Sequence, residues 1–148
     1  FFSTTTGHST FPLRLVCSEM CIRDSQRGDA VAVVAPSSQL RLEQPRLAER
    51  AFQILEEDWG LQVTYTPKLT RSHLHLAGSD QDRAAEFQQQ LEDEKVRAVF
   101  CIRGGYGVAR VLPLLQPASW HDKPKWLIGF SDCSLLLHYL QRHTDWLV

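Results

Sequence analysis

Unbroken apolar runs recur along the chain from residue 26 onward. Runs of small and β-branched residues predict buried strands at Ala30–Ala35 and Val96–Ile102. Shorter apolar runs predict two more strands, within residues 61–66 and within residues 125–130. Residues 144–148 could begin a further strand.

Segments with apolar residues at helical spacing follow these strands. The first predicted helix ends at Gly60, and the second begins with Ser79 or Asp80 as its N-cap. Pro113 shortens the third helix, and the fourth follows the pair Ser131-Asp132. The first helix shows its spacing at Leu47, Ala51, Ile54 and Leu55.

Alternation of strand and helix is typical of an α/β domain with a parallel sheet. We therefore predict a Rossmann-like or flavodoxin-like parallel sheet with flanking helices over residues 26–148. The preceding 25 residues differ, because they show no sustained helical or strand periodicity. Their last six, Met20-Cys-Ile-Arg-Asp-Ser25, resemble an in-frame translation of a sequencing adapter, so we interpret residues 1–25 as a non-native or disordered extension.

Composition narrows the classes of partner. The 148 residues are 43% hydrophobic and 22% charged with a net charge of −1, which favours neither nucleic acid nor a membrane as a partner. The Cys17/Cys21 pair lacks the further ligands of a zinc site, and Cys101 and Cys133 end apolar runs as buried free thiols do. We expect a soluble, intracellular domain without disulfides.

Three loops leave predicted strands at their carboxyl ends. They are Pro36-Ser37-Ser38, Arg103-Gly104-Gly105-Tyr106-Gly107 and Gly129-Phe130-Ser131-Asp132. Parallel sheets bind ligands at this edge, beside the point where the strand order reverses. We therefore expect the three loops to converge on one site.

Ser131 has two interpretations. A nucleophile on a strand-to-helix turn needs a small residue two positions earlier, and Gly129 meets that need, although Cys133 replaces the usual second glycine. The amide of Asp132 could then help to hold an oxyanion. Alternatively, Ser131 is only the N-cap of the next helix.

The other polar features are less specific. Adjacent Gly104 and Gly105 could cradle a phosphate, supply an oxyanion amide or simply form a turn. The hydroxyls of Ser37 and Ser38 are expected to cap a local turn. No histidine in the chain is singled out as a base, because a solvated or structural role is favoured for His73, His75, His121, His138 and His143.

Four segments taken together resemble the muramoyl-tetrapeptide (LD-)carboxypeptidase family, which includes the microcin C self-immunity peptidases. In order along the chain they are VAVVAPSS, LAGSDQDRAAEF, VFCIRGGYGVARVLPLL and PKWLIGFSDCSLLLHYL. The likeness covers residues 26–148 and implies a serine peptidase with a Ser-His-Glu triad.

The resemblance also implies the role of each site residue. It places the nucleophile at Ser131 and the oxyanion amides at Asp132 and at Gly105, with Gly104 as the second choice. Arg103, Gly104 and Tyr106 would lie near the substrate. Neither His138 nor His143 matches the family histidine, since the family Glu and His belong to a C-terminal domain. We therefore expect residues 26–148 to be an N-terminal nucleophile domain that is inactive alone and exposes the surface that packs on its second domain.

The implied activity is cleavage of the L,D-peptide bond to the terminal D-alanine of murein tetrapeptides, in the cytoplasm, during peptidoglycan recycling. The implied partners are this or a related small peptide, with no nucleic acid, membrane, metal or organic cofactor, and a homodimer is considered for the full-length protein. Two alternatives stay open: a microcin C-type amidase, and a non-catalytic module in which the glycine loop binds a small ligand.

Overall fold

The computed structural model describes residues 26–40, 45–70, 72–144 and 146, and the interpretation of residues 1–25 lies outside them. Four parallel strands form one sheet in the order β2-β1-β3-β4. Their bounds are Ala30–Val34 for β1, Gln62–Tyr65 for β2, Val96–Cys101 for β3 and Trp126–Ile128 for β4. The expected α/β class with a parallel sheet is confirmed.

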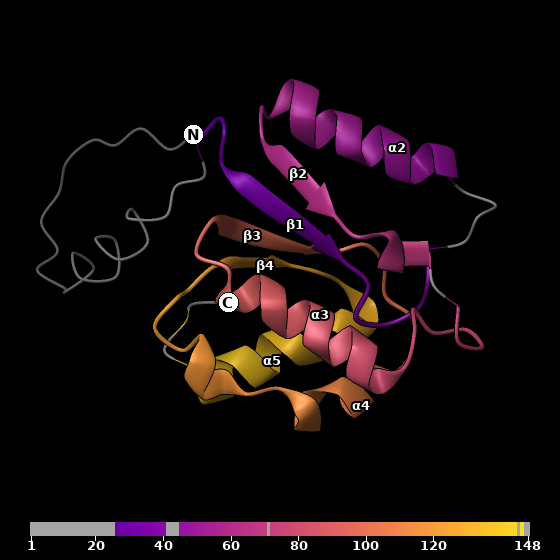
Figure 1. Cartoon of the computed structure of the whole chain (residues 1–148), viewed down its shortest axis with the longest axis vertical. Helices are drawn as coiled ribbons and strands as arrows, with labels where there is room; N and C mark the ends of the chain where they lie inside the picture. Colours follow the sequence, from indigo (N-terminus) through magenta and orange to yellow (C-terminus); the bar gives the residue numbers. More distant parts are fainter. Residues whose placement is uncertain (1–25, 41–44, 71, 145, 147–148) are drawn as a thin grey trace, which may run out of the picture.

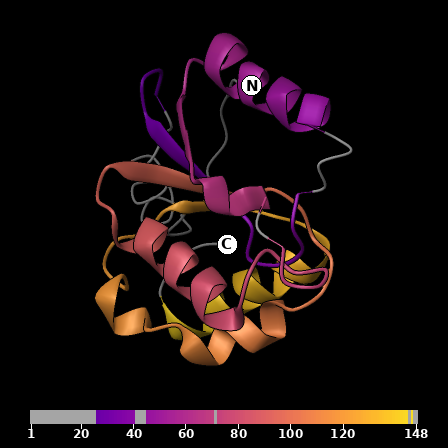
Figure 2. The same cartoon turned by 45° about the vertical axis from the view of Figure 1, so that its right-hand side comes forward.

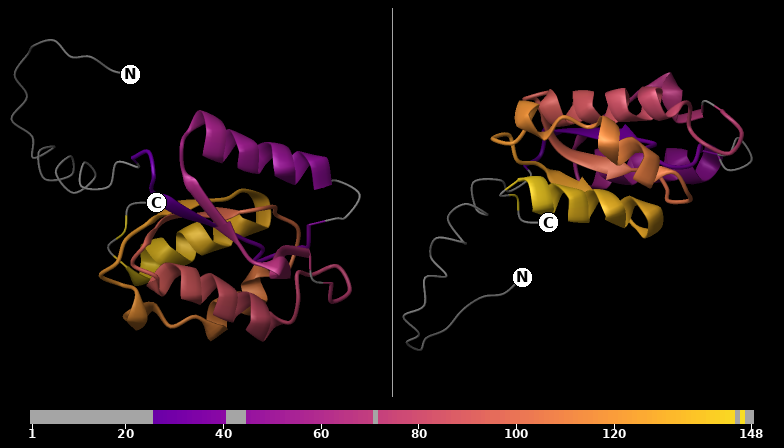
Figure 3. Two further views of the ribbon diagram at one scale, coloured as in Figure 1. Left: turned by 45° about the horizontal axis from the view of Figure 1, so that its top comes forward. Right: turned by 90° about the horizontal axis from the view of Figure 1, so that it is seen from below.

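Helices cover the two faces of the sheet unequally. Helix α2 (Pro45–Gln53) lies on one face, and α3 (Asp80–Glu92), α4 (Val108–Val111) and α5 (Ser134–His143) form a layer on the other (Figure 1). Turning the molecule shows the sheet between these layers (Figure 2). A view onto the three-helix layer shows α4 between α3 and α5 (Figure 3, right).

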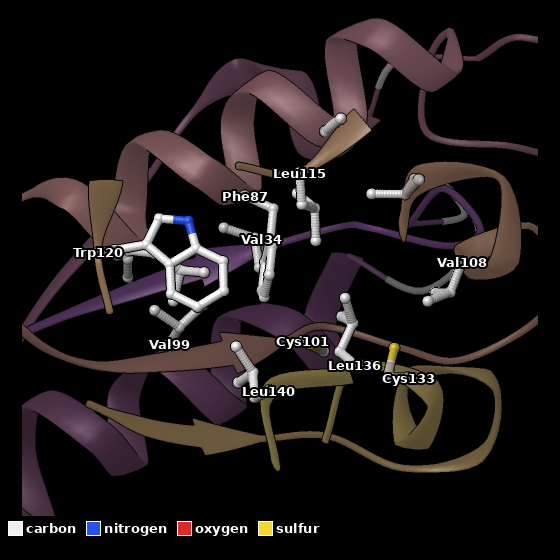
Figure 4. Close-up of a cluster of buried hydrophobic side chains, with 14 of the residues drawn as sticks. Val34, Phe87, Val99, Cys101, Val108, Leu115, Trp120, Cys133, Leu136 and Leu140 are labelled. Atoms are coloured by element: carbon white, nitrogen blue, oxygen red, sulfur yellow. The ribbon is translucent and has the colours of Figure 1, made fainter. Parts of the chain in front are cut away.

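The largest apolar cluster lies between the sheet and this three-helix layer. Val34 and Val99 of the sheet meet Phe87 of α3, Leu136 of α5 and the fully buried Trp120 there (Figure 4). Val31 and Val33 point to the opposite face, as the two-residue period of a strand requires. The sheet is therefore buried on both faces along β1, as its unbroken apolar sequence predicts.

The ends of the helices are determined by local capping residues and by proline. Ser79 caps α3, since its side chain accepts a hydrogen bond from the Asp82 amide. Pro113, which has no amide hydrogen to donate, turns the chain into a 3₁₀ segment at Leu112–Leu114. Residues 67–70 form a short 3₁₀ helix.

The first helix differs most from its prediction. Its last turn widens into a π-helix at Ile54–Asp58, where the Trp59 amide donates to the Ile54 carbonyl 3.1 Å away. Ala51 is exposed, whereas Ala48 and Leu55 are buried and Phe52 is partly buried and stacks on Tyr65. The inward face of α2 is therefore rotated by one residue from the expected one.

Candidate active site

The order of the strands creates a switch point between β1 and β3. The chain leaves β1 to build β2 on one side and returns to build β3 on the other. Ligands of such sheets bind in the crevice outside the carboxyl ends of the two strands that flank the switch. The loops after β1 and β3 lie at this place, and the loop after β4 is their neighbour.

The three loops meet, as expected from the sequence. A Cβ atom built on Gly104 would lie 2.7 Å from the Ser131 Cβ and 3.1 Å from its Oγ. A Cβ atom on Gly105 would lie 2.0 Å from the Ser38 Oγ. Both glycines are therefore required by close packing: Gly104 lies against the serine and Gly105 lies over the loop that follows β1.

Ser131 stands on a strained turn between β4 and α5. Its φ angle is +58°, a left-handed conformation that side-chain-bearing residues rarely adopt, and the residue is exposed. Gly129 lies two residues earlier, and a Cβ atom built on it would lie 3.0 Å from the Cβ of Cys133 and 3.3 Å from the Cβ of Cys101. The backbone thus has the form of a nucleophile turn.

The alternative role of Ser131 as a helix cap is wrong for this structure. A 3₁₀ turn at Ser131–Cys133 has Phe130 as its N-cap, and α5 has Cys133 as its N-cap. Neither cap position makes a side-chain capping bond. The Ser131 carbonyl accepts a 2.5 Å hydrogen bond from the Ser134 hydroxyl.

The side chain of Asp132 has a structural role that sequence reasoning missed. One carboxylate oxygen, Oδ2, accepts hydrogen bonds from the Ser37 hydroxyl at 2.7 Å and from the Val108 amide at 3.0 Å. The loop after β4 is thereby joined to the loop after β1 and to the start of α4. Ser37 is fully buried, so its expected role as a simple turn cap is replaced by this long-range bond.

Further contacts fasten the glycine loop. The Cys133 thiol donates to the Arg103 carbonyl at 3.4 Å, which gives a structural function to a residue whose sequence signal indicated none. Arg103 is half-buried and donates through Nη1 to the Gln39 carbonyl at 3.3 Å. Tyr106 is 66% exposed, and its ring lies 6.3 Å from that of His75, also exposed.

The two described cysteines are free and buried, as predicted, while Cys17 and Cys21 lie outside the described residues. The neighbouring Cys133 thiol and, after it, burial raise the pKa of Cys101 well above its usual value. His138 and His143 lie on exposed positions of α5. Within the described part of the chain, no group of three or more His, Cys, Asp or Glu side chains could hold a metal ion.

Comparison with known proteins agrees with this arrangement. The sequence model of the LD-carboxypeptidase N-terminal domain matches residues 31–148. The chain belongs to the LD-carboxypeptidase N-terminal domain family. The family match covers all three loops and both glycines of the pair at positions 104 and 105.

Curated relatives of this LD-carboxypeptidase domain include two bacterial proteins. The chain is 34% identical over 118 residues to the "Probable murein peptide carboxypeptidase" of Bacillus subtilis, covering 80% of this chain and 36% of that protein. It is 32% identical over 118 residues to the murein tetrapeptide carboxypeptidase of Pseudomonas aeruginosa, covering 76% and 36%. The chain therefore spans about a third of the length of these relatives.

Among solved structures, the domain resembles the microcin C7 self-immunity protein MccF in its apo state. The TM-score is 0.76 at 21% sequence identity, over 82% of this chain and 36% of that one. At this identity the likeness establishes the fold. Among the described residues, no helix is both long and apolar enough to cross a bilayer.

Proposed function

We propose that this domain carries the nucleophile of a serine LD-carboxypeptidase that cleaves murein tetrapeptides. The observation that carries the proposal is the backbone of Ser131, which is left-handed, exposed and packed against Gly104 at the carboxyl edge of the sheet. A strained backbone at this edge of the sheet, next to the switch point, is where a reactive side chain is expected. The named relatives support the reaction class.

The proposed chemistry is acyl transfer through a covalent intermediate. Ser131 Oγ attacks the carbonyl carbon of the L,D-peptide bond, and its proton passes to a histidine. The tetrahedral intermediate collapses, and the same histidine returns the proton to the departing amine of D-alanine. Water then hydrolyses the acyl-serine ester. Backbone amides of Asp132 and Gly105 are proposed to hold the oxyanion, with Gly104 as second choice.

The histidine and the glutamate that orients it are proposed to come from the portion of the full-length protein that this chain does not span. A serine that lacks its base keeps only part of the catalytic acceleration, so the 148-residue chain alone is expected to be inactive. Arg103 and Tyr106 are proposed to contact the substrate. Tyr106 suits this role because two thirds of its surface is exposed beside the glycine loop. A cytoplasmic location and a homodimer stay predictions.

A direct test replaces Ser131 in the full-length protein. Ser131→Ala should lower turnover of a murein tetrapeptide by at least about a thousandfold while leaving peptide binding within a few fold. Ser119→Ala, which removes the hydroxyl of an exposed residue bonded to Glu92 at the C-terminal end of α3, is the matched control and should keep full activity. Retained turnover in Ser131→Ala would refute the nucleophile assignment.

Two further assays on the full-length protein, hydrolysis of a second substrate and ligand binding, distinguish the two alternative functions from a carboxypeptidase. A microcin C-type amidase would hydrolyse an aminoacyl-sulfamoyl nucleoside and spare the tetrapeptide, and it would still need Ser131. A binding module would release no product from either compound. It would lose ligand affinity on substitution of Gly105 and keep it in Ser131→Ala.

A further inference from the structure

Two ionisable side chains join the same pair of loops. Asp132 accepts hydrogen bonds from the Ser37 hydroxyl and the Val108 amide. Arg83 donates through Nη1 to the Pro36 carbonyl and to the Gly107 carbonyl, the latter at 3.1 Å. The loop after β1 and the end of the glycine loop are therefore connected at two consecutive residues each.

The two connections differ in what they can affect. Arg83 belongs to α3 and is held there by Asp80, so it fixes the loops to the helical layer. Asp132 follows Ser131 directly in the chain. Because Asp132 directly follows Ser131, a carboxylate anchored to both loops restrains the Ser131 backbone and the Asp132 amide.

The packing around Ser131 leaves little room for such a shift. The α-carbon of Gly104 lies so close that an added Cβ would be 2.7 Å from the Ser131 Cβ. Gly107 is the N-cap of α4 and has a φ angle of +116°, and the next amide, that of Val108, donates to the Asp132 carboxylate. One carboxylate oxygen with two donors, together with the Cys133 thiol on the Arg103 carbonyl, therefore holds the glycine loop against the Ser131 turn.

We propose that the Ser37 hydroxyl and the Asp132 carboxylate are positioning residues that hold Ser131 in register with the amides of the glycine loop. This inference rests on the proposed function, since it assigns those amides to the oxyanion. The Ser37 hydroxyl orients the carboxylate, and the carboxylate sets the spacing. Neither side chain touches the substrate, so their effect is on the transition state.

The expected kinetic signature follows from this role. An error of about 1 Å in the placement of an oxyanion donor costs roughly a hundredfold in rate. Asp132→Ala should lower kcat of the full-length enzyme by about a hundredfold, and Ser37→Ala by about tenfold, with KM within about twofold in both. Asp132→Asn, which keeps an oxygen acceptor, should recover most of the loss seen in Asp132→Ala.

A double-mutant cycle tests whether Ser37 acts through Asp132. If it does, Ser37→Ala in the Asp132→Ala background should lower kcat by less than about twofold further. Thr144→Val is the matched control, because Thr144 is also a buried hydroxyl with two hydrogen bonds, to the Leu140 carbonyl and from the Trp146 amide, at the far end of α5. It should lower thermal stability and leave kcat unchanged.

The outcomes separate this inference from the proposed function. If Ser131→Ala abolishes turnover while Ser37→Ala and Asp132→Ala keep parental kcat, the nucleophile stands and the positioning role is overturned. Independent losses in the double mutant, or a loss confined to KM or to stability, would also overturn it. If Ser131→Ala retains turnover, the proposed function fails regardless of the results at Ser37.

Discussion

At the scale of single residues, Ser131 combines an unfavourable backbone with an exposed hydroxyl. Its φ angle of +58° costs a side-chain-bearing residue about 1 kcal/mol, and this cost is compensated by the surrounding packing. A residue selected only for stability at this position would be glycine. The strain is therefore an observation that points to chemistry, independent of any relative.

This strain predicts an inverted order of stability at position 131. Ser131→Gly should be more stable than Ser131→Ala by about 0.5–1 kcal/mol, because glycine relieves the left-handed backbone and alanine does not. At Ser134, where φ is −62°, the usual order should hold and the alanine variant should be more stable by about 1 kcal/mol. Urea unfolding of the 148-residue chain measures both pairs. If the difference in unfolding free energy between the glycine and alanine variants had the same sign at both positions, the left-handed backbone at Ser131 would be contradicted.

Sequence patterns located Ser131 and Gly129 because a nucleophile turn has a local signature. The bond between Ser37 and Asp132 has none, since the two residues are 95 positions apart and a serine after a strand is common. The structural role of Cys133 has no local signature for the same reason. Its contact with the Arg103 carbonyl exists only after the loops have converged.

At the scale of elements, buried polar contacts fix where strands and helices meet. Lys125, which directly precedes β4, is buried and donates through Nζ to the Asp93 carbonyl and, at 2.7 Å, to the Val96 carbonyl. These bonds fasten β4 to the turn between α3 and β3. Loss of contact with water lowers the pKa of Lys125 from 10.5 to about 8.

A pH-dependent stability follows from the lowered pKa. Between pH 8 and 10.5 the unfolded chain binds the Lys125 proton and the folded chain releases it, so this residue raises stability as pH increases through that window. Between pH 8 and 10.5, the free energy of unfolding of the wild-type chain should rise by on the order of 1 kcal/mol relative to that of Lys125→Met. Lys95→Met, at an exposed lysine on the same turn, is the control. A difference in unfolding free energy between wild type and Lys125→Met that stays constant with pH would show that the pKa of Lys125 is not lowered.

The elements themselves were largely predictable, because uninterrupted apolar runs specify buried parallel strands. All four strands, the capping of α3 by Ser79 and the shortening of α4 by Pro113 came from local rules. The inward face of α2 does not follow from local rules, because Leu47 and Ala51 have the same helical spacing as Ala48 and Phe52. In the folded domain Phe52 packs against Tyr65 of β2, which favours the second pair.

At the scale of the whole molecule, one face of the sheet is covered only in part. Trp126 and Ile128 pair with Ala98 and Phe100 of β3, so their side chains share the face on which α2 lies. They are 42% and 41% exposed, and Phe130 just beyond them is 62% exposed. A contiguous apolar surface of this kind promotes association.

This surface predicts self-association of the isolated chain. Ile128→Lys should lower the binding of a hydrophobic dye and shift the sedimentation profile toward monomer, with unfolding free energy within about 1 kcal/mol of the parent. Leu74→Lys, at an isolated loop residue that is 83% exposed, is the control and should change neither property. Equal effects of both variants would show that the apolar surface formed by Trp126, Ile128 and Phe130 does not drive self-association.

The proposed mechanism requires that Ser131 becomes acylated during turnover. Mass spectrometry of the full-length protein, quenched during turnover of a murein tetrapeptide, followed by mapping of the modified peptide, tests this step. We expect an acyl adduct on Ser131, in the peptide that contains Gly129 and Asp132, and no adduct in Ser131→Ala. An adduct on another residue during normal turnover would refute the assignment of Ser131 as the nucleophile.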